Sequence, residues 1–250
     1  MFADSRRTIL DPVDAYSALA PSYRAHSQRR LPYLRSVERV IATHISGAES
    51  LLDVGSGDGS RACRIAESAK VDELVMVEPS GAMRSLCAAN REVWNCKASE
   101  IPLSTRKFDI ITCLWNVLGH IEADERRASL LRLKQLLAPS GTIFLDVNHR
   151  YNAAEYGWGH TFTRRLRDLL CWSENNGDVV LDWKAGERLI STRGHVFTRR
   201  EMDQLFLSTG LTVQHLWILD YTTGAERRLP WLGNLLYQLK VSDRISGGGS

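Results

Sequence analysis

Three alternating glycines follow a short apolar run that ends in an aspartate, within the segment LLDVGSGDGS at residues 51–60. Gly55, Gly57 and Gly59 can adopt positive φ, and they leave the main chain open to a ligand because no Cβ intervenes. A helix that starts after such a loop presents its first N–H groups and its positive dipole end to an anion. The loop therefore predicts a site for a carboxylate or phosphate, with a tight ligand-free turn as the alternative.

A glutamate further along the chain makes this prediction more specific. The run ELVMVEPS, residues 73–80, contains Glu78, which lies roughly 20 residues beyond Gly57. At this distance an acid ends the neighbouring parallel strand and can accept hydrogen bonds from ribose hydroxyls. Loop and acid together favour an adenosine-type ligand.

The elements that would position these residues are short strands alternating with helices. Strands are expected at 51–54, 73–77, 93–96, 108–114 and 142–147, and helices near 60–69, 80–90 and 123–137. Such alternation indicates a parallel sheet covered by helices on both faces, with ligands at the carboxyl ends of its strands. The glycine loop and Glu78 both lie at such ends.

The second half of the chain continues the α/β pattern after an insertion. A helix is expected at residues 161–170, followed by two strands around Lys-Ala-Gly within 178–196. Thr198 and Glu201 form a capping box that starts a helix ending at Gly210. Two closing strands are expected at 213–221 and 234–243.

Composition describes an ordinary globular protein. The 250 residues are 44% hydrophobic and 24% charged, enough for one domain with an inserted cap. No apolar run is long enough to span a membrane and the N-terminus lacks a signal-peptide core, so we expect a soluble, cytoplasmic protein without a membrane partner.

Five cysteines without a close pair predict reduced thiols and neither disulfides nor a metal site. The net charge of +3 does not by itself indicate a nucleic-acid partner.

Four segments, LLDVGSGDGS, VMVEPSGAM, FDIITCLWNVLGHI and LLAPSGTIFLDVN, together resemble the motif series of class I S-adenosylmethionine-dependent methyltransferases. The resemblance covers residues 15–147 well and the rest of the chain in outline. The spacing G-x-G-x-G differs from the G-x-G-x-x-G of dinucleotide dehydrogenases. The resemblance implies S-adenosyl-L-methionine as the cofactor.

The implied fold is Rossmann-like: a doubly wound, mostly parallel seven-stranded sheet with helices on both faces and an antiparallel final strand. A helical lid at residues 1–45 would precede the methyltransferase domain at 46–245. Residues 150–196, after the fifth strand, would form a small substrate-side cap, and 246–250 a flexible tail.

The resemblance also implies which residues bind the cofactor. The loop backbone would contact the methionine part, Asp53 would hold its amino end, and Glu78 would bind both ribose hydroxyls. Met83 would lie beside the adenine, and Tyr23 of the lid would cover the site. The complete expected set is Asp53, Gly55, Ser56, Gly57, Gly59, Glu78, Pro79, Met83, Ala98, Ser99, Trp115 and Tyr23.

One position departs from the family pattern. Many relatives carry an aspartate after the third strand that accepts a hydrogen bond from the adenine amino group, and alignment of CKASEIPL places Lys97 there. A lysine cannot accept that bond. Ser99 or a backbone carbonyl would have to replace it, or the alignment shifts by one or two residues.

The expected chemistry is an in-line displacement at the methyl carbon, in which the protein aligns the nucleophile, excludes water and in some enzymes removes a proton. His120 and His149, after the fourth and fifth strands, are the candidate bases. The alternatives are that His120 caps a turn and that His149 is a surface loop residue. Asn116 is a candidate for positioning the substrate or cofactor, because an amide both donates and accepts.

The substrate is predicted less sharply than the reaction. A lid with Tyr16 and Tyr23 and an aromatic-rich insertion favour a small molecule methylated at nitrogen or oxygen. The alternative is a tRNA methyltransferase of the wobble-uridine type, because HVFTRREMDQLF is similar to that group and four arginine pairs could bind phosphates. A third possibility is a non-catalytic partner protein that binds S-adenosylmethionine. The arginine pairs are Arg29–Arg30, Arg164–Arg165, Arg199–Arg200 and Arg227–Arg228.

Overall fold

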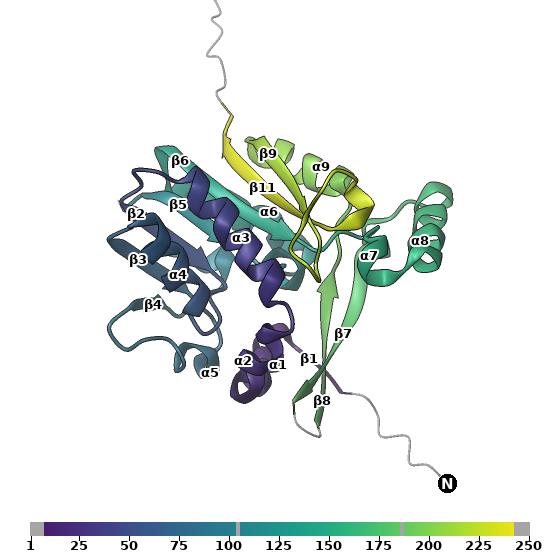
Figure 1. The fold of residues 1–250 in the computed structure, drawn as a ribbon, viewed down its shortest axis with the longest axis horizontal. Coiled ribbons are helices and arrows are strands. Elements are labelled where there is room, and N and C mark those ends of the chain that lie inside the picture. The colour runs from purple at the N-terminus through teal and green to yellow at the C-terminus, as the bar shows by residue number, and fades with distance from the viewer. Residues whose placement is uncertain (1–7, 104–105, 186–187, 243–250) are drawn as a thin grey trace, which may run out of the picture.

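The computed structural model describes residues 8–103, 106–185 and 188–242. Its centre is an eight-stranded sheet in the order β10-β9-β11-β6-β5-β2-β3-β4 (Figure 1). The strands are β2 (Ser50–Val54), β3 (Glu73–Val77), β4 (Glu92–Trp94), β5 (Phe108–Cys113), β6 (Leu137–Val147), β9 (Leu211–Leu219), β10 (Glu226–Arg227) and β11 (Asn234–Val241). The fold is thus the mixed α/β, Rossmann-like architecture expected from the sequence.

The sheet has eight strands where the sequence predicted seven. The β2 to β6 pairings are parallel, and the final strand β11 is antiparallel to both of its neighbours, as expected. The additional strand, β10, has two residues and pairs antiparallel with β9 across a turn at Gly224. A strand this short carries no alternation of apolar residues that a sequence pattern could reveal.

Helices cover both faces of the sheet, because each strand directs successive side chains to opposite sides. On one face α3 (Leu31–His44) and α4 (Ser60–Ala69) share a core with Leu51, and on the other α6 (Ala123–Leu136) and α9 (Arg199–Thr209) share a core with Leu52. The capping box of Thr198 and Glu201 is present and α9 ends at Gly210. Helix α5 (Gly81–Arg84) is shorter than the sequence predicted.

The chain before β2 and the insertion after β6 meet in a second sheet. Strand β1 (Ile9–Leu10) pairs parallel with β8 (Arg188–His195), which pairs antiparallel with β7 (Asp178–Ala185). Helices α1 (Pro12–Leu19) and α2 (Tyr23–Gln28) lie in the segment that the sequence predicts as the lid, and α7 (Ala153–Tyr156) and α8 (Trp158–Leu170) lie in the predicted insertion. The lid and the insertion are therefore one joined structure at the edge of the molecule (Figure 1).

Short 3₁₀ helices complete the described chain: η1 (Ala20–Ser22), η2 (Ala98–Glu100), η3 (Val117–His120), η4 (Glu174–Gly177) and η5 (Pro230–Leu232). Part of the predicted Lys-Ala-Gly turn and the whole predicted tail at 246–250 lie outside the described residues. No helix in the described ranges has both the length and the apolar character needed to cross a membrane.

Candidate cofactor and active site

The glycine loop links β2 to α4 in a left-handed backbone. Gly55, Gly57 and Gly59 have φ of 72°, 60° and 72°, values that residues with a Cβ adopt only with strain. A Cβ on Gly55 would overlap a Val117 methyl, and one on Gly57 would lie 2.8 Å from the Tyr23 hydroxyl. The glycines are therefore needed for close packing of the lid and η3 as well as for an open backbone.

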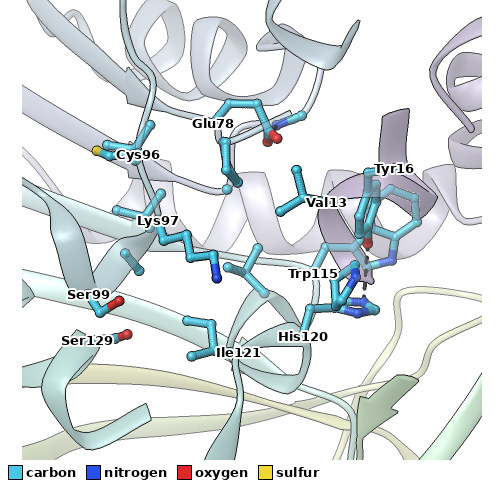
Figure 2. Close-up of a pocket in the computed structure, with 18 of the residues that line it drawn as sticks. Val13, Tyr16, Glu78, Cys96, Lys97, Ser99, Trp115, His120, Ile121 and Ser129 are labelled. Atoms are coloured by element: carbon cyan, nitrogen blue, oxygen red, sulfur yellow. Dashed lines mark hydrogen bonds between the residues drawn. The ribbon is translucent and has the colours of Figure 1, made fainter. Parts of the chain in front are cut away.

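Glu78 connects the glycine loop to the end of β3. Its carboxylate accepts hydrogen bonds of 2.8 Å from the backbone N–H groups of Gly57 and Ser80. Burial raises the pKa of Glu78, while these two bonds oppose the rise. The side chain is 6% exposed and faces the pocket (Figure 2), so a bound ligand would meet a buried carboxylate that is already oriented.

A pocket opens at the carboxyl ends of the parallel strands. It encloses about 950 Å³, part of it open to solvent. Nine residues predicted from the sequence line it: Tyr23, Gly55, Gly57, Glu78, Pro79, Ala98, Ser99, Trp115 and His120. The sequence did not single out Val13 of α1, Arg61 of α4 or Ile121, which also line it.

The end of β5 is held in an unusual turn. Trp115 and Asn116 have φ of 63° and 61°, the left-handed region that non-glycine residues rarely adopt. The buried carboxylate of Asp146 on β6 accepts hydrogen bonds from both of their N–H groups and from the Tyr33 hydroxyl. Asp146 thereby directs Trp115 and the following η3 toward the pocket. The sequence showed only an acid within an apolar strand and so gave no sign of this role.

His120 contacts the lid at the end of η3. Its Nε2 lies 3.2 Å from the Tyr16 hydroxyl, and the two rings pack edge to face with centroids 5.3 Å apart (Figure 2). Trp183 of β7 packs on Tyr16 at 4.9 Å. Burial lowers the pKa of His120 to about 4, so the ring is neutral at pH 7 and can accept a proton.

The structure does not bring His149 or Asn116 to the pocket lining. His149 is buried, its Nδ1 is 2.7 Å from the Pro230 carbonyl oxygen, and burial lowers its pKa to about 4. The Asn116 amide donates to the His195 carbonyl and accepts from the Asn148 N–H. Both side chains therefore tie the strand ends together.

Four of the expected cofactor residues also lie outside the lining: Asp53, Ser56, Gly59 and Met83. Met83 is fully buried with Leu19 and Tyr23 in the core beneath the lid. Gly59 packs against Met76, and Ser56 donates to the Asp53 carbonyl. Of the tryptophans in the insertion, Trp183 reaches the lid at Tyr16, as described above.

Loss of stability in acid is an expected consequence of the two buried histidines. An ordinary histidine pKa is about 6.5. Below that pH the unfolded chain binds protons that His120 and His149 do not bind in the folded protein. The stability they contribute is present above pH 6.5 and falls as the pH approaches 4. We expect about 2 kcal/mol to be lost per histidine between pH 7 and pH 5.

Urea unfolding of wild type and His149→Gln at pH 7 and pH 5 measures this loss. The variant retains a donor for Pro230 but cannot titrate, so its free energy of unfolding should fall by about 2 kcal/mol less than that of wild type. Equal losses in the two proteins would contradict the neutral, buried state of His149.

Comparison with known proteins identifies the class. A family model described as a methyltransferase domain matches residues 23–216, so the chain belongs to that family. A search of curated proteins found no match. The fold and the cofactor pocket are those of a class I S-adenosylmethionine-dependent methyltransferase, and S-adenosylmethionine is the cofactor.

Solved structures show the same fold at low sequence identity. The CcbJ methyltransferase from Streptomyces caelestis has a TM-score of 0.61 and 14% identity, covering 83% of this chain and 89% of that one. CalS10, an amino pentose methyltransferase from Micromonospora echinaspora, has a TM-score of 0.57 and 18% identity, covering 87% and 95%. DesVI from Streptomyces venezuelae has a TM-score of 0.58 and 14% identity, covering 94% and 100%.

The polar groups around the pocket suit the methionine end of this cofactor. Among the described residues, Asp53 Oδ2 and Arg61 Nε are buried without a hydrogen-bond partner. One is an acceptor and the other a donor, matching the α-amino and α-carboxylate groups of methionine. Glu78 would hold the ribose, and the loop after β4 would hold the adenine.

Lys97 gives a testable consequence for adenine recognition. Its side chain extends into the pocket (Figure 2), and an ammonium group can only donate hydrogen bonds. We therefore expect weak discrimination, less than about tenfold, between S-adenosylhomocysteine and its deaminated inosine analogue, whose exocyclic 6-oxo oxygen accepts a hydrogen bond where the adenine amino group donates one.

Calorimetry with both compounds on wild type, Lys97→Met and Lys97→Asp tests this expectation. Lys97→Asp should favour the adenine form by at least about tenfold more than wild type does, because a carboxylate accepts from the amino group. Strong preference for adenine in all three proteins would show that Lys97 does not face the base.

Proposed function

We propose that the protein transfers the methyl group of S-adenosylmethionine to a nitrogen or oxygen nucleophile of a small molecule. The observation that carries this proposal is the position of His120, which lines both the cofactor pocket and an adjoining cleft of about 800 Å³. A residue shared by the two cavities lies where a donor and an acceptor would meet.

The cleft has the character of a site for a polar small molecule. Arg126 and Arg193 line it together with Glu122 and Asp178, so both charge signs are present. The Arg126 side chain is fixed by a bond from its Nε to the Ile121 carbonyl, 3.1 Å long, and by stacking on Phe197. Fixed charges of both signs favour an acceptor with its own polar groups.

The chemistry divides between cofactor and protein. S-adenosylmethionine supplies an activated methyl group whose leaving group is a neutral sulfide. His120 would accept the proton of the nucleophile at Nδ1, which has no hydrogen-bond partner among the described residues, and its Nε2–H would donate to the Tyr16 hydroxyl, which orients the ring. The aromatic side chains of the lid and β7 would exclude water from the reacting atoms.

Two structural neighbours make a nitrogen nucleophile the first one to test. One is the amino pentose methyltransferase CalS10 and the other is the glycopeptide N-methyltransferase MtfA. At 18% and 13% identity they share the fold, and the choice of acceptor for this chain remains our proposal.

An RNA substrate has less support from the arginine pairs. Arg30 forms a 2.6 Å ion pair with Glu155, and Arg227 forms one of 2.8 Å with Asp220. Arg164 donates to the Arg150 carbonyl oxygen and stacks on Tyr156. One arginine in each of these three pairs therefore already has a partner within the protein, which leaves fewer cations for phosphates.

A methyl-transfer assay with tritium-labelled S-adenosylmethionine distinguishes the candidate functions. Small amines, amino sugars and hydroxylated compounds form one arm, and bulk tRNA the other. Label in the small-molecule arm supports the proposal. Label in tRNA, together with tRNA binding that weakens steeply as the salt concentration rises, would instead indicate an RNA methyltransferase. Cofactor binding without transfer to any fraction of a cell extract would favour a non-catalytic partner protein.

A further inference from the structure

Helix α8 is amphipathic, but its polar side faces the protein and its apolar side faces solvent. Its polar residues Thr161 and Asp168 are buried against the protein, where Asp168 forms a 2.9 Å ion pair with the fully buried Arg150. Its large apolar side chains face solvent. These form the α8 stripe, with exposed fractions of 65% for Trp158, 68% for Phe162, 43% for Leu166, 80% for Leu169 and 72% for Leu170.

An exposed apolar stripe of this size indicates a surface that another molecule covers when the protein functions. Surface helices place their apolar face against the core, and monomeric proteins rarely expose contiguous apolar patches of several hundred Å². The helix lies at the outer edge of the molecule, remote from β2 to β4 (Figure 1). Nothing in the fold of the described residues prevents another surface from reaching it.

The shape of the stripe suits an identical helix. Trp158, Phe162, Leu166 and Leu170 are spaced four residues apart and form one continuous ridge. Beside the first half of this ridge run Gly159 and Thr163, whose small size leaves a groove of the same inclination that ends at Arg167. A helix that carries both a ridge and an adjacent groove is complementary to a second copy of itself, crossing at about −50°.

The area is also sufficient. Aromatic side chains bury roughly 150–250 Å² each when fully covered, so the exposed parts of the stripe amount to on the order of 600 Å² per copy. Standard interfaces bury about 600–1,000 Å² per partner. We propose that the α8 stripe is the interface of a homodimer in which α8 packs against α8 of a second copy around a twofold axis.

Charge is compatible with this arrangement. The one acid of α8, Asp168, is buried, whereas Arg165 and Arg167 are exposed. Arg165 lies on the side of the ridge away from the groove, so ridge-into-groove packing leaves it in solvent. Arg167 lies at the end of the groove, where its guanidinium donates to the Asn176 carbonyl oxygen of the same chain. The same arginines could also approach an anionic lipid surface, and the experiment therefore includes that alternative.

The variant Gly159→Leu distinguishes binding of a second copy of the protein from binding of a lipid surface. Among the described residues, a Cβ on Gly159 would meet nothing within 4 Å, so the substitution should fold normally and gain helix propensity. It fills the groove and should weaken dimerisation at least a hundredfold. On a lipid surface the added leucine would instead strengthen binding.

Size-exclusion chromatography with light scattering gives the mass of wild type, Gly159→Leu, Phe162→Glu and the control Leu207→Glu, which alters an 81% exposed leucine on α9. We expect wild type and Leu207→Glu to be dimers, and Gly159→Leu and Phe162→Glu to be monomers that bind S-adenosylmethionine normally. A monomeric wild type, or dimers in all four proteins, would overturn the proposal. So would flotation of a monomeric wild type with phosphatidylglycerol vesicles that Gly159→Leu increases.

Discussion

Replacing Glu78 by alanine is expected to weaken S-adenosylmethionine binding by at least about a hundredfold. The carboxylate would accept two hydrogen bonds from the ribose, and bonds to charged groups contribute about 1.5–3 kcal/mol each. The substitution also removes the acceptor for the Gly57 and Ser80 N–H groups, which would loosen the glycine loop. Isothermal titration calorimetry measures the affinity directly.

Two further variants test whether the loss of affinity comes from the hydrogen bonds between Glu78 and the ribose. Glu78→Gln keeps one carbonyl acceptor for the backbone and should fall between alanine and wild type. Asp72→Ala removes an exposed carboxylate just before the other end of β3 and should bind normally. An affinity for Glu78→Ala within a few-fold of wild type would remove Glu78 from the cofactor site.

Replacing His120 by alanine should reduce kcat by about a hundredfold or more while leaving the affinity for S-adenosylmethionine within a few-fold of wild type. General-base catalysis typically contributes that factor, and His120 stands at the junction of pocket and cleft. Single-turnover rates with saturating cofactor separate this chemical effect from binding.

The pH profile distinguishes a proton acceptor from a residue that only fills space. A base must be deprotonated, so with a pKa of about 4 it should impose no loss of kcat between pH 8 and pH 5 and a decline only below that range. Tyr16→Phe should give a smaller loss, and His160→Ala, an exposed histidine on α8, should give none. A His120→Ala rate within a few-fold of wild type would mean that the protein acts by aligning the nucleophile with the methyl group, without a general base.

The parts of the site that lie close together in sequence could be predicted from it. The positive φ of three glycines, the acid that ends the next parallel strand and the helix that follows the loop are all local patterns, and the structure has each of them. The parallel order of the strands followed from the alternation of strand and helix.

Long-range contacts account for what could not be predicted. His120 and His149 both follow strands and are alike in sequence, yet contact with Pro230, far along the chain, buries His149 away from the pocket. The left-handed turn at Trp115 depends on Asp146 from the next strand. The pairing of β1 with β8 joins segments about 180 residues apart, for which no local pattern exists.

Calorimetric titration of the purified protein with S-adenosylmethionine, and separately with NADH, measures whether this pocket binds the methyl donor. We expect one S-adenosylmethionine bound per chain, a much weaker interaction in Glu78→Ala, and no binding of NADH. Binding of NADH, or no binding of S-adenosylmethionine by a folded protein, would contradict the assignment of this pocket to methyl transfer.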